Sequence, residues 1–527
     1  MKKTIITAVS VQSMMMTMIQ LFLLTVLVGC QSGHISRPAN EIFLPSLTIN
    51  DEGNHPVVKA YRLALGDVFS NVQDHYIPLL GQKKSCLYAG FEYVEPWTRD
   101  AAINVWNGFA LLSPSIALNT LLAQLDTLDD ERIVITHEYW DKIIWSIGAW
   151  HYYLATGNQD FLGLAYTAVS NTLAIMEDTE YSSALGLFRG PAVYGDGVSA
   201  YPAIYTKHAD TSLTGSYSGI SDWPVFNPSL KANTGKGIPM HVLSTNSVYY
   251  YTYKLMPQYE QALGIGVDPS WHKKAAALKH SINKHLWDEG RGMYHYFVDP
   301  FGGCDHQEGM GLSLAILLGV AESSQVQSIF NNTTITPAGI PCVYPSYERY
   351  HNAALDSYGR HSGTVWPHIQ GLWAEACIQN GYSEGFFHEF EVLTQHALRD
   401  NQFYELYHPA TGMPYGGIQE PTHKIWEEWY CGARQTWSAT AYIRMLLFNI
   451  IGMDLSPDGL KFKPNIPSYM ASLELTNLVY RNMVLDIRIQ GNGDEILSLV
   501  INEADSDSFL KSHLRGHQRI RIEMKNN

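Results

Sequence analysis

The sequence lacks the clustered basic residues by which proteins bind nucleic acids. Its 50 Asp and Glu residues outnumber its 35 Lys and Arg residues, the formal net charge is −15, and no block of like charge stands out. Binding to a phosphate backbone requires a concentrated positive face. We therefore expect no nucleic-acid partner.

Cysteine is scarce, and its spacing excludes a disulfide framework. Besides Cys30 the chain holds an odd number of widely spaced cysteines, none of them in a CxxC pair. This pattern offers no metal-binding spacing, so we expect buried free thiols and no metal or other cofactor. A single chance bridge in an oxidising compartment is the alternative. The remaining cysteines are Cys86, Cys304, Cys342, Cys377 and Cys431.

The sequence also lacks a repeat of fixed period, which an open helical solenoid would show. Its 527 residues are 46% hydrophobic, a composition typical of globular proteins. A chain of this length is too long for one small core. We expect one large domain with appendages.

The N-terminal residues 1–29 have the composition of a signal peptide. Lys2 and Lys3 supply positive charge ahead of an apolar stretch. Residues 27–30 (LVGC) resemble the lipobox of bacterial lipoproteins, in which the cysteine is lipidated. We expect a protein of the bacterial cell envelope, anchored to the membrane through lipid on Cys30 and not spanning it. An ordinary secretory signal with a chance cysteine is the alternative.

Residues 30–55 show little periodicity, and we expect them to form a tether. From residue 56 to 452, apolar residues recur at intervals of three and four, which predicts α-helices. In one example a helical face over residues 140–154 ends at Gly157, and Asp160 is then expected to cap the next helix.

Twelve helical segments can be distinguished in this region. A turn as short as the one around Gly157 forces its two helices to lie antiparallel, and twelve such helices would make six hairpins. The pattern therefore predicts a mainly α fold, an (α/α)6 six-hairpin barrel. The expected helices begin near His55, Arg99, Ser113, Glu138, Asp160, Thr245, Asp268, Glu308, Ser323, Thr364, Ser383 and Arg434.

After Gly452 the pattern changes to short strands. Runs such as 483–489 and 519–522 largely alternate apolar and polar residues, and Gly-rich turns separate them. We expect residues 453–527 to form a small antiparallel β domain that packs on the barrel.

Four long connections between the helices concentrate aromatic and charged residues. In a scaffold of tight hairpins, an extended loop usually carries function. The four are YVEPWTRD at 93–100, FRGPAVYGDG at 188–197, HSGTVWP at 361–367, and the stretch 403–437, which contains FYELYHPATG, WEEW and RQTW.

Two of these stretches resemble known families. The WTRD motif at 97–100 resembles the signature of glucoamylases and related six-hairpin glycosidases. The ELYHPATG string at 405–412 is similar to the base-bearing loop of glycoside hydrolase family 63 and its debranching-like relatives. These short motifs are scattered over residues 56–465. The resemblance implies a six-hairpin fold and a carbohydrate substrate.

The resemblance also implies roles for individual residues. In these families the general acid follows the fifth helix and the base follows the eleventh, positions that Asp196 and Glu405 occupy here. Arg99 and Asp100 would hold hydroxyls of the terminal sugar. This chain departs from the family at the acid, because family 63 usually has a Ser-Gly-x-Asp pattern where residues 194–197 are YGDG.

The chemistry explains why two carboxyl groups are needed. An inverting hydrolase uses one protonated carboxyl to donate to the leaving oxygen and one carboxylate to activate water, about 6.5–9.5 Å apart. The acid keeps its proton in a dry site or near another negative charge, which Asp100 or Glu308 could supply. Arg434, at an expected helix start where the dipole disfavours a cation, should have a carboxylate partner such as Glu405.

Each candidate also has a structural alternative. Asp100 could cap a helix, Asp196 could form a turn, and Glu405 could be a solvated loop carboxylate. Glu427 and Glu428, which could also be solvated, are the substitutes for Glu405. The remaining candidates could stack on sugar or bind its hydroxyls, but could equally be core or helix-start residues: Trp97, Trp366, Trp429, Trp437 and Glu308.

Together these features predict an inverting, exo-acting glycoside hydrolase that releases a terminal sugar, glucose from an α-glucoside or oligosaccharide. A phosphorylase, epimerase or lyase on the same fold is one alternative, because fold alone does not determine the reaction. A non-catalytic glycan-binding lipoprotein is another.

Overall fold

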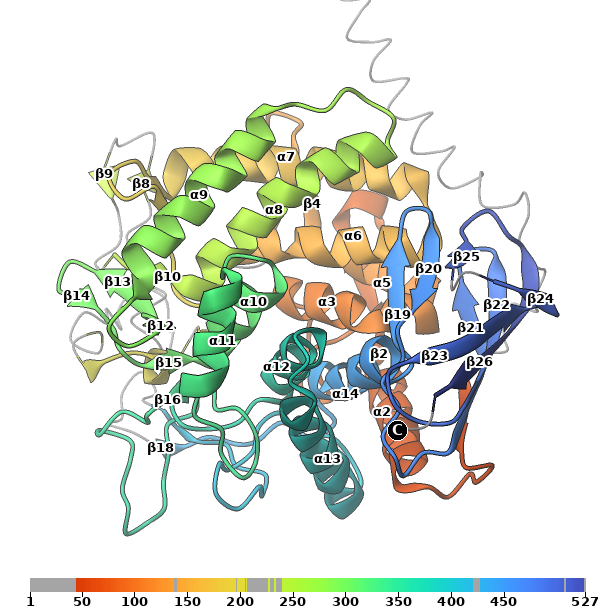
Figure 1. Ribbon diagram of the computed structural model, residues 1–527. Helices are drawn as coiled ribbons and strands as arrows, with labels where there is room; N and C mark the ends of the chain where they lie inside the picture. Colours follow the sequence, from red (N-terminus) through yellow and green to blue (C-terminus); the bar gives the residue numbers. More distant parts are fainter. Residues whose placement is uncertain are drawn as a thin grey trace, which may run out of the picture.

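The computed structural model describes residues 44–136, 140–195, 197–203, 205, 239–419, 427–506 and 509–525, and the strands at 226–227 and 232–233. The expected signal peptide and Cys30 lie outside these residues. Figure 1 shows a helical body with a β-sheet at one side. Within the described residues, no helix has the length and apolar character needed to cross a membrane.

All twelve expected helices are present, and all but one begin within a few residues of the predicted position. The π-helical turns Val105–Phe109 and Met445–Ile450 extend two of them. The helices are α2 (Pro56–Ser70), α3 (Thr98–Asn104), α4 (Ala110–Leu112), α5 (Pro114–Leu122), α6 (Trp145–Thr156), α7 (Gln159–Thr179), α8 (Leu243–Ala262), α9 (Ser270–Leu286), α10 (Gly309–Leu317), α11 (Ser323–Asn332), α12 (Pro367–Gln379), α13 (Ser383–Asp400) and α14 (Thr436–Arg444).

The exception is α6, which was expected to begin near Glu138. A 3-10 turn at Lys142–Ile144 precedes it, so the apolar periodicity starts before the α-helix does. Its end agrees with the sequence, since Gly157 adopts a left-handed conformation with φ +70°. The prediction that Asp160 caps α7 is wrong, because Asn158 is the cap and accepts a hydrogen bond from the next turn.

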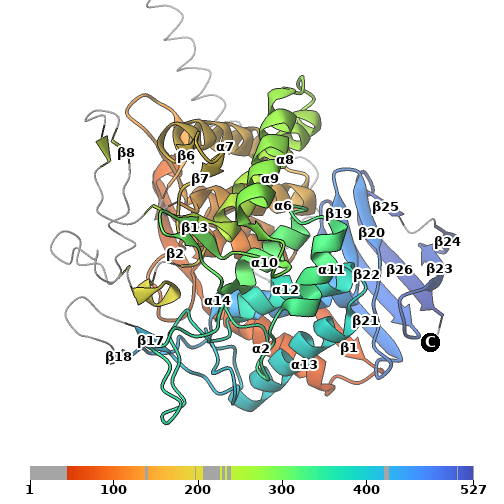
Figure 2. The ribbon, with the colours of Figure 1, turned by 60° about the vertical axis from the view of Figure 1, so that its left-hand side comes forward.

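Six helices form a closed ring. In the order α3, α6, α8, α10, α12, α14, each packs against the next, and α14 packs against α3. Helices α2, α5, α7, α9 and α13 pack on the outside of this ring (Figure 2). Gly148 allows α6 to approach α3 closely, because a Cβ at this position would lie 2.7 Å from the Cα of Ala102.

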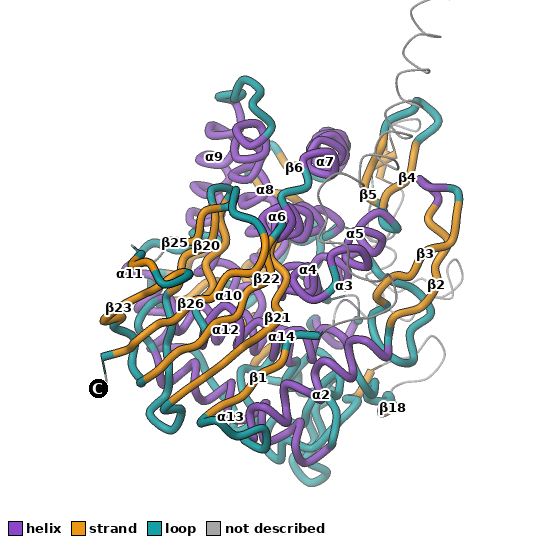
Figure 3. Tube along the Cα trace, turned by 90° about the vertical axis from the view of Figure 1, so that its right-hand side faces the viewer, coloured by secondary structure: helices purple, strands orange, loops and turns teal. Residues whose placement is uncertain are grey.

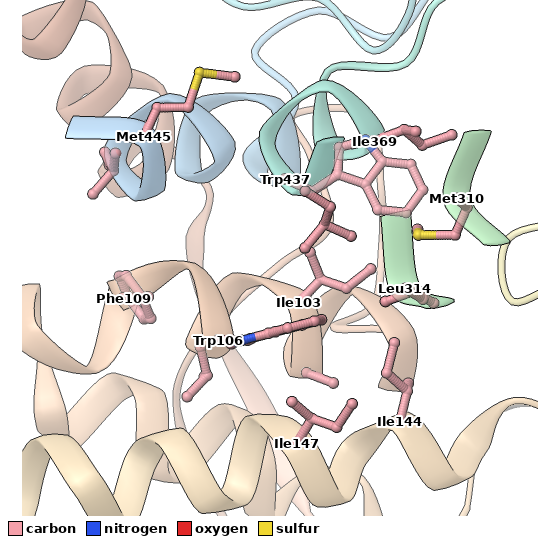
Figure 4. Close-up of a cluster of buried hydrophobic side chains, with 14 of the residues drawn as sticks. Ile103, Trp106, Phe109, Ile144, Ile147, Met310, Leu314, Ile369, Trp437 and Met445 are labelled. Atoms are coloured by element: carbon pink, nitrogen blue, oxygen red, sulfur yellow. The ribbon is translucent and has the colours of Figure 1, made fainter. Parts of the chain in front are cut away.

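The interior of the ring is filled by apolar side chains. In Figure 4 the side chains of Ile103, Trp106, Ile147 and Leu314 lie in the space below Trp437, and each of them is buried. Full burial of such a side chain contributes about 1.5–3 kcal/mol to folding. The ring is therefore a packed core and not a channel.

The C-terminal region is β, as expected, but its sheet is mixed. The order is β1-β21-β22-β26-β23-β24, in which β22 and β26 run parallel (Figure 3). The expectation of a purely antiparallel domain is therefore wrong, because alternation shows which side chains face the core but not the direction of pairing. Strands β19, β20 and β25 form a second sheet. The strands are β19 (Met453–Ser456), β20 (Gly459–Phe462), β21 (Ser472–Tyr480), β22 (Met483–Gln490), β23 (Ile496–Ile501), β24 (Ala504–Asp505), β25 (Phe509–Lys511) and β26 (Gly516–Met524).

Strand β1 (Ser46–Ile49) lies within the predicted tether, yet it pairs with β21 and belongs to the same sheet. The tether prediction is therefore wrong for these residues. Leu47 and Ile49 are buried in the sheet, and two alternating apolar residues are too short a signal to predict a strand.

Short strands also occur in the connections between helices. They are β2 (Val72–Ile77), β3 (Gln82–Leu87), β4 (Leu125–Thr127), β5 (Ile133–Ile135), β6 (Tyr181–Ser182), β7 (Leu187–Phe188), β8 (Phe226–Asn227), β9 (Ala232–Asn233), β10 (His241–Val242), β11 (Trp287–Asp288), β12 (Met293–Tyr294), β13 (Phe297–Asp299), β14 (Gly302–Gly303), β15 (Gln307–Glu308), β16 (Val343–Tyr344), β17 (Ile418–Gln419) and β18 (Glu427–Glu428).

The cysteines follow the prediction of buried free thiols only in part, because Cys304 and Cys431 are partly exposed. Cys86, Cys304, Cys342, Cys377 and Cys431, which are all within the described residues, are free thiols.

Candidate active site

The connections that precede the ring helices contact one another at one end of the ring. The Tyr93 hydroxyl, before α3, donates to Glu405, before α14, at 2.6 Å. The Tyr194 hydroxyl, before α8, donates to the carbonyl of Cys342, before α12, at 3.0 Å. Long connections from distant parts of the sequence therefore form a single mouth.

Glu405 is held in this mouth by donors on both of its oxygens. The side chain is 1% exposed, so the alternative of a solvated loop carboxylate is wrong. Besides Tyr93 on Oε1, its Oε2 accepts from Arg360 at 2.6 Å and from the backbone N–H of Gly432 at 3.2 Å. Three donors around one carboxyl match an ionised carboxylate, which accepts but does not donate.

Arg360 is the buried cation of this pair, and sequence reasoning missed it. Burial lowers the pKa of Arg360, but the Glu405 carboxylate and Tyr93 raise it by more, so the guanidinium remains charged. It lies over the Trp366 ring at 5.3 Å and the Trp429 ring at 5.9 Å. The only sequence signal was its position immediately before one of the aromatic loops.

Arg434 is not the partner of Glu405, contrary to the prediction. It lies two residues before α14 with φ +47°, its side chain is exposed, and its guanidinium lies 5.5 Å from the centre of the Phe91 ring. The helix-start argument failed because the backbone turns at Arg434 and directs the side chain to solvent.

The four candidate tryptophans fall into two groups. Trp366 and Trp437 are 3% and 5% exposed and pack against each other at 5.8 Å. Trp366 also lies against the Arg360 guanidinium, and Trp437 packs on Trp366. Trp97 and Trp429 are half-buried, so they retain ring surface on which a sugar could stack.

Arg99 and Asp100 lie in the first turn of α3, and both are buried. The Arg99 guanidinium donates to Asp141 at 3.0 Å and to the carbonyl of Val193 at 2.6 Å. It therefore connects α3 with the connection that precedes α8. Trp97 occupies the N-cap position, so the alternative in which Asp100 caps this helix is wrong.

Glu308 precedes α10 and is 1% exposed. Burial raises the pKa of Glu308 to about 8, although a hydrogen bond from Ser244 opposes the shift. The carboxyl therefore holds its proton at neutral pH. Its Oε1 has no hydrogen-bond partner among the described residues, so its hydrogen-bonding capacity is unused in this structure.

The raised pKa predicts how stability depends on pH. Glu308 ionises near 4.5 in the unfolded chain and near 8 in the folded protein, so unfolding releases a proton between these values. The free energy of unfolding then falls as pH rises through this window, by about 1.4 kcal/mol per pH unit for one group. Thermal unfolding measured from pH 5 to pH 8 should show that stability falls less steeply with pH in Glu308→Gln than in wild type.

Glu389 provides the internal comparison for this experiment. Burial raises the pKa of Glu389 to about 8 as well, and this residue is unchanged in Glu308→Gln, so part of the pH dependence should remain. Equal slopes in the two proteins would contradict a protonated Glu308.

Several polar atoms beside the Arg360–Glu405 pair have no partner among the described residues. They are both ring nitrogens of His368, both amide atoms of Gln435 and the indole nitrogen of Trp437. His368 is fully buried and stacks on Trp437 at 4.1 Å. Burial, with Arg99 and His361, lowers the pKa of His368 well below its usual value, so the ring is neutral. Such groups suit a ligand rich in hydroxyls.

Asp196 lies outside the described residues, but the next residue is placed. A Cβ at Gly197 would lie 2.7 Å from the His361 ring, and His361 directly follows Arg360. Gly197 therefore lies beside the loop that follows Arg360. Sequence reasoning did not select His361, although it lies in one of the four aromatic loops.

Glu427 and Glu428 form β18, which pairs with β17. Glu428 is exposed, whereas Glu405 is buried among donors. The solvated alternative therefore applies to Glu428.

Among the described residues, one group away from the mouth could hold a metal ion. The ligand atoms of Asp288, His295 and Asp305 lie within 4.8 Å of one another. Asp305 already contacts His295 at 2.8 Å and Arg291 at 3.3 Å, and the backbone N–H of Gly290 donates to Asp288 at 2.9 Å. These interactions account for the cluster without a metal.

Comparison with protein families gives one match. Residues 136–438 match the model of the mannosylglycerate hydrolase MGH1-like glycoside hydrolase domain. This segment includes Asp196, Glu308, Arg360 and Glu405. No curated protein sequence matches the chain at a significant level.

Solved structures with the same fold include several glycosidases. The family 63 mannosylglycerate hydrolase of Thermus thermophilus, in complex with glucose, has a TM-score of 0.54 and 13% identity over 73% of this chain and 99% of that chain. A sialidase has a TM-score of 0.60 and 13% identity over 91% of this chain. The family 78 rhamnosidase of Bacillus sp. GL1 has a TM-score of 0.52 and 13% identity over 92% of this chain.

The chain spans 40% of the sialidase and 44% of the rhamnosidase. At 13% identity these structures show a shared fold.

Proposed function

Because the chain belongs to the family of mannosylglycerate hydrolase MGH1-like glycoside hydrolase domains, and is therefore a glycoside hydrolase, we propose that it is an inverting, exo-acting enzyme that releases a terminal sugar. The resemblance to family 63, drawn from the ELYHPATG motif at 405–412, is confirmed by this match. The proposed substrate is an α-glucoside or oligosaccharide that yields glucose.

The observation that carries this proposal is the environment of Glu405. A carboxylate whose oxygens accept from Tyr93, Arg360 and Gly432 is oriented and kept as an acceptor, which is what a general base requires. Asp196, by its place in the sequence, supplies the general acid. Its neighbour Gly197 approaches His361, the residue that directly follows Arg360.

In the proposed reaction, Glu405 takes a proton from water as the water attacks the anomeric carbon. Asp196 donates its proton to the departing glycosidic oxygen, and the bond between that oxygen and the anomeric carbon breaks. Arg360 holds Glu405 in place, and the unpartnered groups of His368 and Gln435 bind hydroxyls of the sugar.

We propose that the closed ring and its outer helices form an (α/α)6 six-hairpin barrel. The support is that, apart from the short α4, one further helix separates each pair of successive ring helices in the sequence, namely α5, α7, α9, α11 and α13, and α2 precedes the first. The connections that lead into the ring helices then lie at one end, where the mouth is found.

We also propose that lipid on Cys30 anchors the protein at the bacterial cell envelope. The support is the LVGC sequence at residues 27–30 behind an apolar stretch.

A mannoside is the second substrate class, since the matched family is named for mannosylglycerate hydrolase.

The test of the proposed function is a screen of α-glucosides and α-mannosides by proton NMR without added phosphate. We expect fresh product with inverted anomeric configuration, which then mutarotates. Retention of configuration would contradict the mechanism, and turnover only with phosphate would identify a phosphorylase.

A further inference from the structure

A cavity of about 550 Å³ lies at the opposite end of the ring from the mouth, within the size range of small-molecule sites. It is lined by ring helices α6, α12 and α14, by strand β19 and by residues 463–465. Helix α12 carries His368 at the mouth and Glu375 in the cavity. In the same way, α14 carries Trp437 at the mouth and Arg444 in the cavity. Seven residues of helix span about 10 Å, and the packed core of Figure 4 lies between the two ends.

A buried ion pair forms the floor of this cavity. Arg444, 2% exposed, donates to Glu375, and the Gln379 amide donates to the other Glu375 oxygen at 2.9 Å. Arg444 also lies 4.5 Å from the Trp106 ring centre. The charges are therefore paired, and the planar amide of Gln379 faces the cavity beside them.

Two polar atoms in the cavity lack partners. Oδ1 of Asn449, a residue that is 2% exposed, and Nδ1 of His151 have no hydrogen-bond partner among the described residues. Asn449 belongs to the π-helical turn Met445–Ile450, a local structure frequent at functional sites. Buried acceptors of this kind are costly unless a ligand or water satisfies them.

A second cavity of about 280 Å³ adjoins the first and shares Ile378, Asn465 and Asp494 with it. It extends toward Ser383 and Phe387 on α13. We call the two together the seam groove, because they follow the junction between the helical ring and the β domain. The two adjoining cavities have the room for a ligand larger than a single small molecule.

The charges of the seam groove disfavour an anion. Its two cations are both paired, Arg444 with Glu375 and Lys463 with Asp454 at 2.9 Å. Asp494 adds a further negative charge. Phe448 and Phe387, one in each cavity, supply rings for an apolar face. Amides, a carboxylate and aromatic rings without a spare cation are the groups that bind neutral sugars.

We propose that the seam groove binds a neutral oligosaccharide, separately from the active site. The seam groove would hold a glycan chain while the active site at the mouth cleaves the end of that chain or of another chain. This inference goes beyond the hydrolase activity and does not depend on which residues catalyse it.

The test is calorimetric titration of the full-length protein with maltotriose and cellotriose. Glu405→Gln is the background, and NMR verifies that each sugar stays intact. We expect two bound trisaccharides per chain for at least one sugar. Gln379→Trp, which fills the cavity from an exposed position, should weaken one of the two sites at least tenfold. Glucose should bind that site at least tenfold more weakly than the trisaccharide.

Gln327→Trp on α11 is the matched control, because Gln327 is also exposed and lies outside the groove. It should leave both sites unchanged, and both variants should keep the unfolding temperature of the Glu405→Gln protein. Equal binding of both trisaccharides by the two tryptophan variants would overturn the proposal. Displacement of the groove-bound sugar by inorganic phosphate would also overturn it, since that result would identify an anion site.

Discussion

Replacement of Glu405 by glutamine is expected to reduce kcat by about 10²–10⁴-fold, the usual contribution of a general base. Glutamine has nearly the same shape but cannot take a proton from the attacking water. KM should change little, because Glu405 acts on water and not on the bound sugar. Initial rates on the substrate found by the NMR screen, with kcat and KM determined separately, measure this effect.

Two further variants separate catalysis from stability. Glu405→Gln leaves the buried Arg360 guanidinium without its charge partner, a change that can cost about 3–5 kcal/mol. Glu405→Asp keeps the charge but moves the carboxylate, so it should preserve the fold and still lose activity. Glu428→Gln, at an exposed carboxylate in the same stretch, should keep wild-type activity. An active Glu405→Gln with an inactive Glu428→Gln would assign the base to β18.

Replacement of Asp196 by asparagine is expected to reduce kcat by a factor that depends on the leaving group. An oligosaccharide leaves as a poor alkoxide and needs a proton, so kcat should fall by about 10²–10⁴-fold. A dinitrophenyl glycoside leaves without protonation, so its cleavage should fall far less. The ratio of the two rates, in the variant and in wild type, is the measurement.

Asp178→Asn is the matched control for this experiment, because Asp178 is an exposed carboxylate at the end of α7. It should cleave both substrates at wild-type rates. An equal loss on both substrates in Asp196→Asn would show that Asp196 does not act as the general acid.

Much of the helical body could be predicted from periodicity and end signals. Ser113 and Pro114 begin α5, and Gly157 ends α6, where predicted, because capping depends on neighbouring residues. The predicted start of α6 was wrong, since a 3-10 turn and an α-helix share nearly the same apolar pattern. The predicted cap of α7 was also wrong, because Asn158 and not Asp160 is the cap. The parallel pairing of β22 with β26 depends on the path of the whole chain.

The sequence by itself determined the helix order, the change to strands after Gly452 and the loop that carries Glu405. These follow from local spacing and short motifs. Only the tertiary structure decided that Arg360, and not Arg434, pairs with Glu405, and that Tyr93 binds its other oxygen. The physical reason is that an ion pair between residues 45 positions apart in the sequence forms only where folding brings two loops together and removes water from both charges.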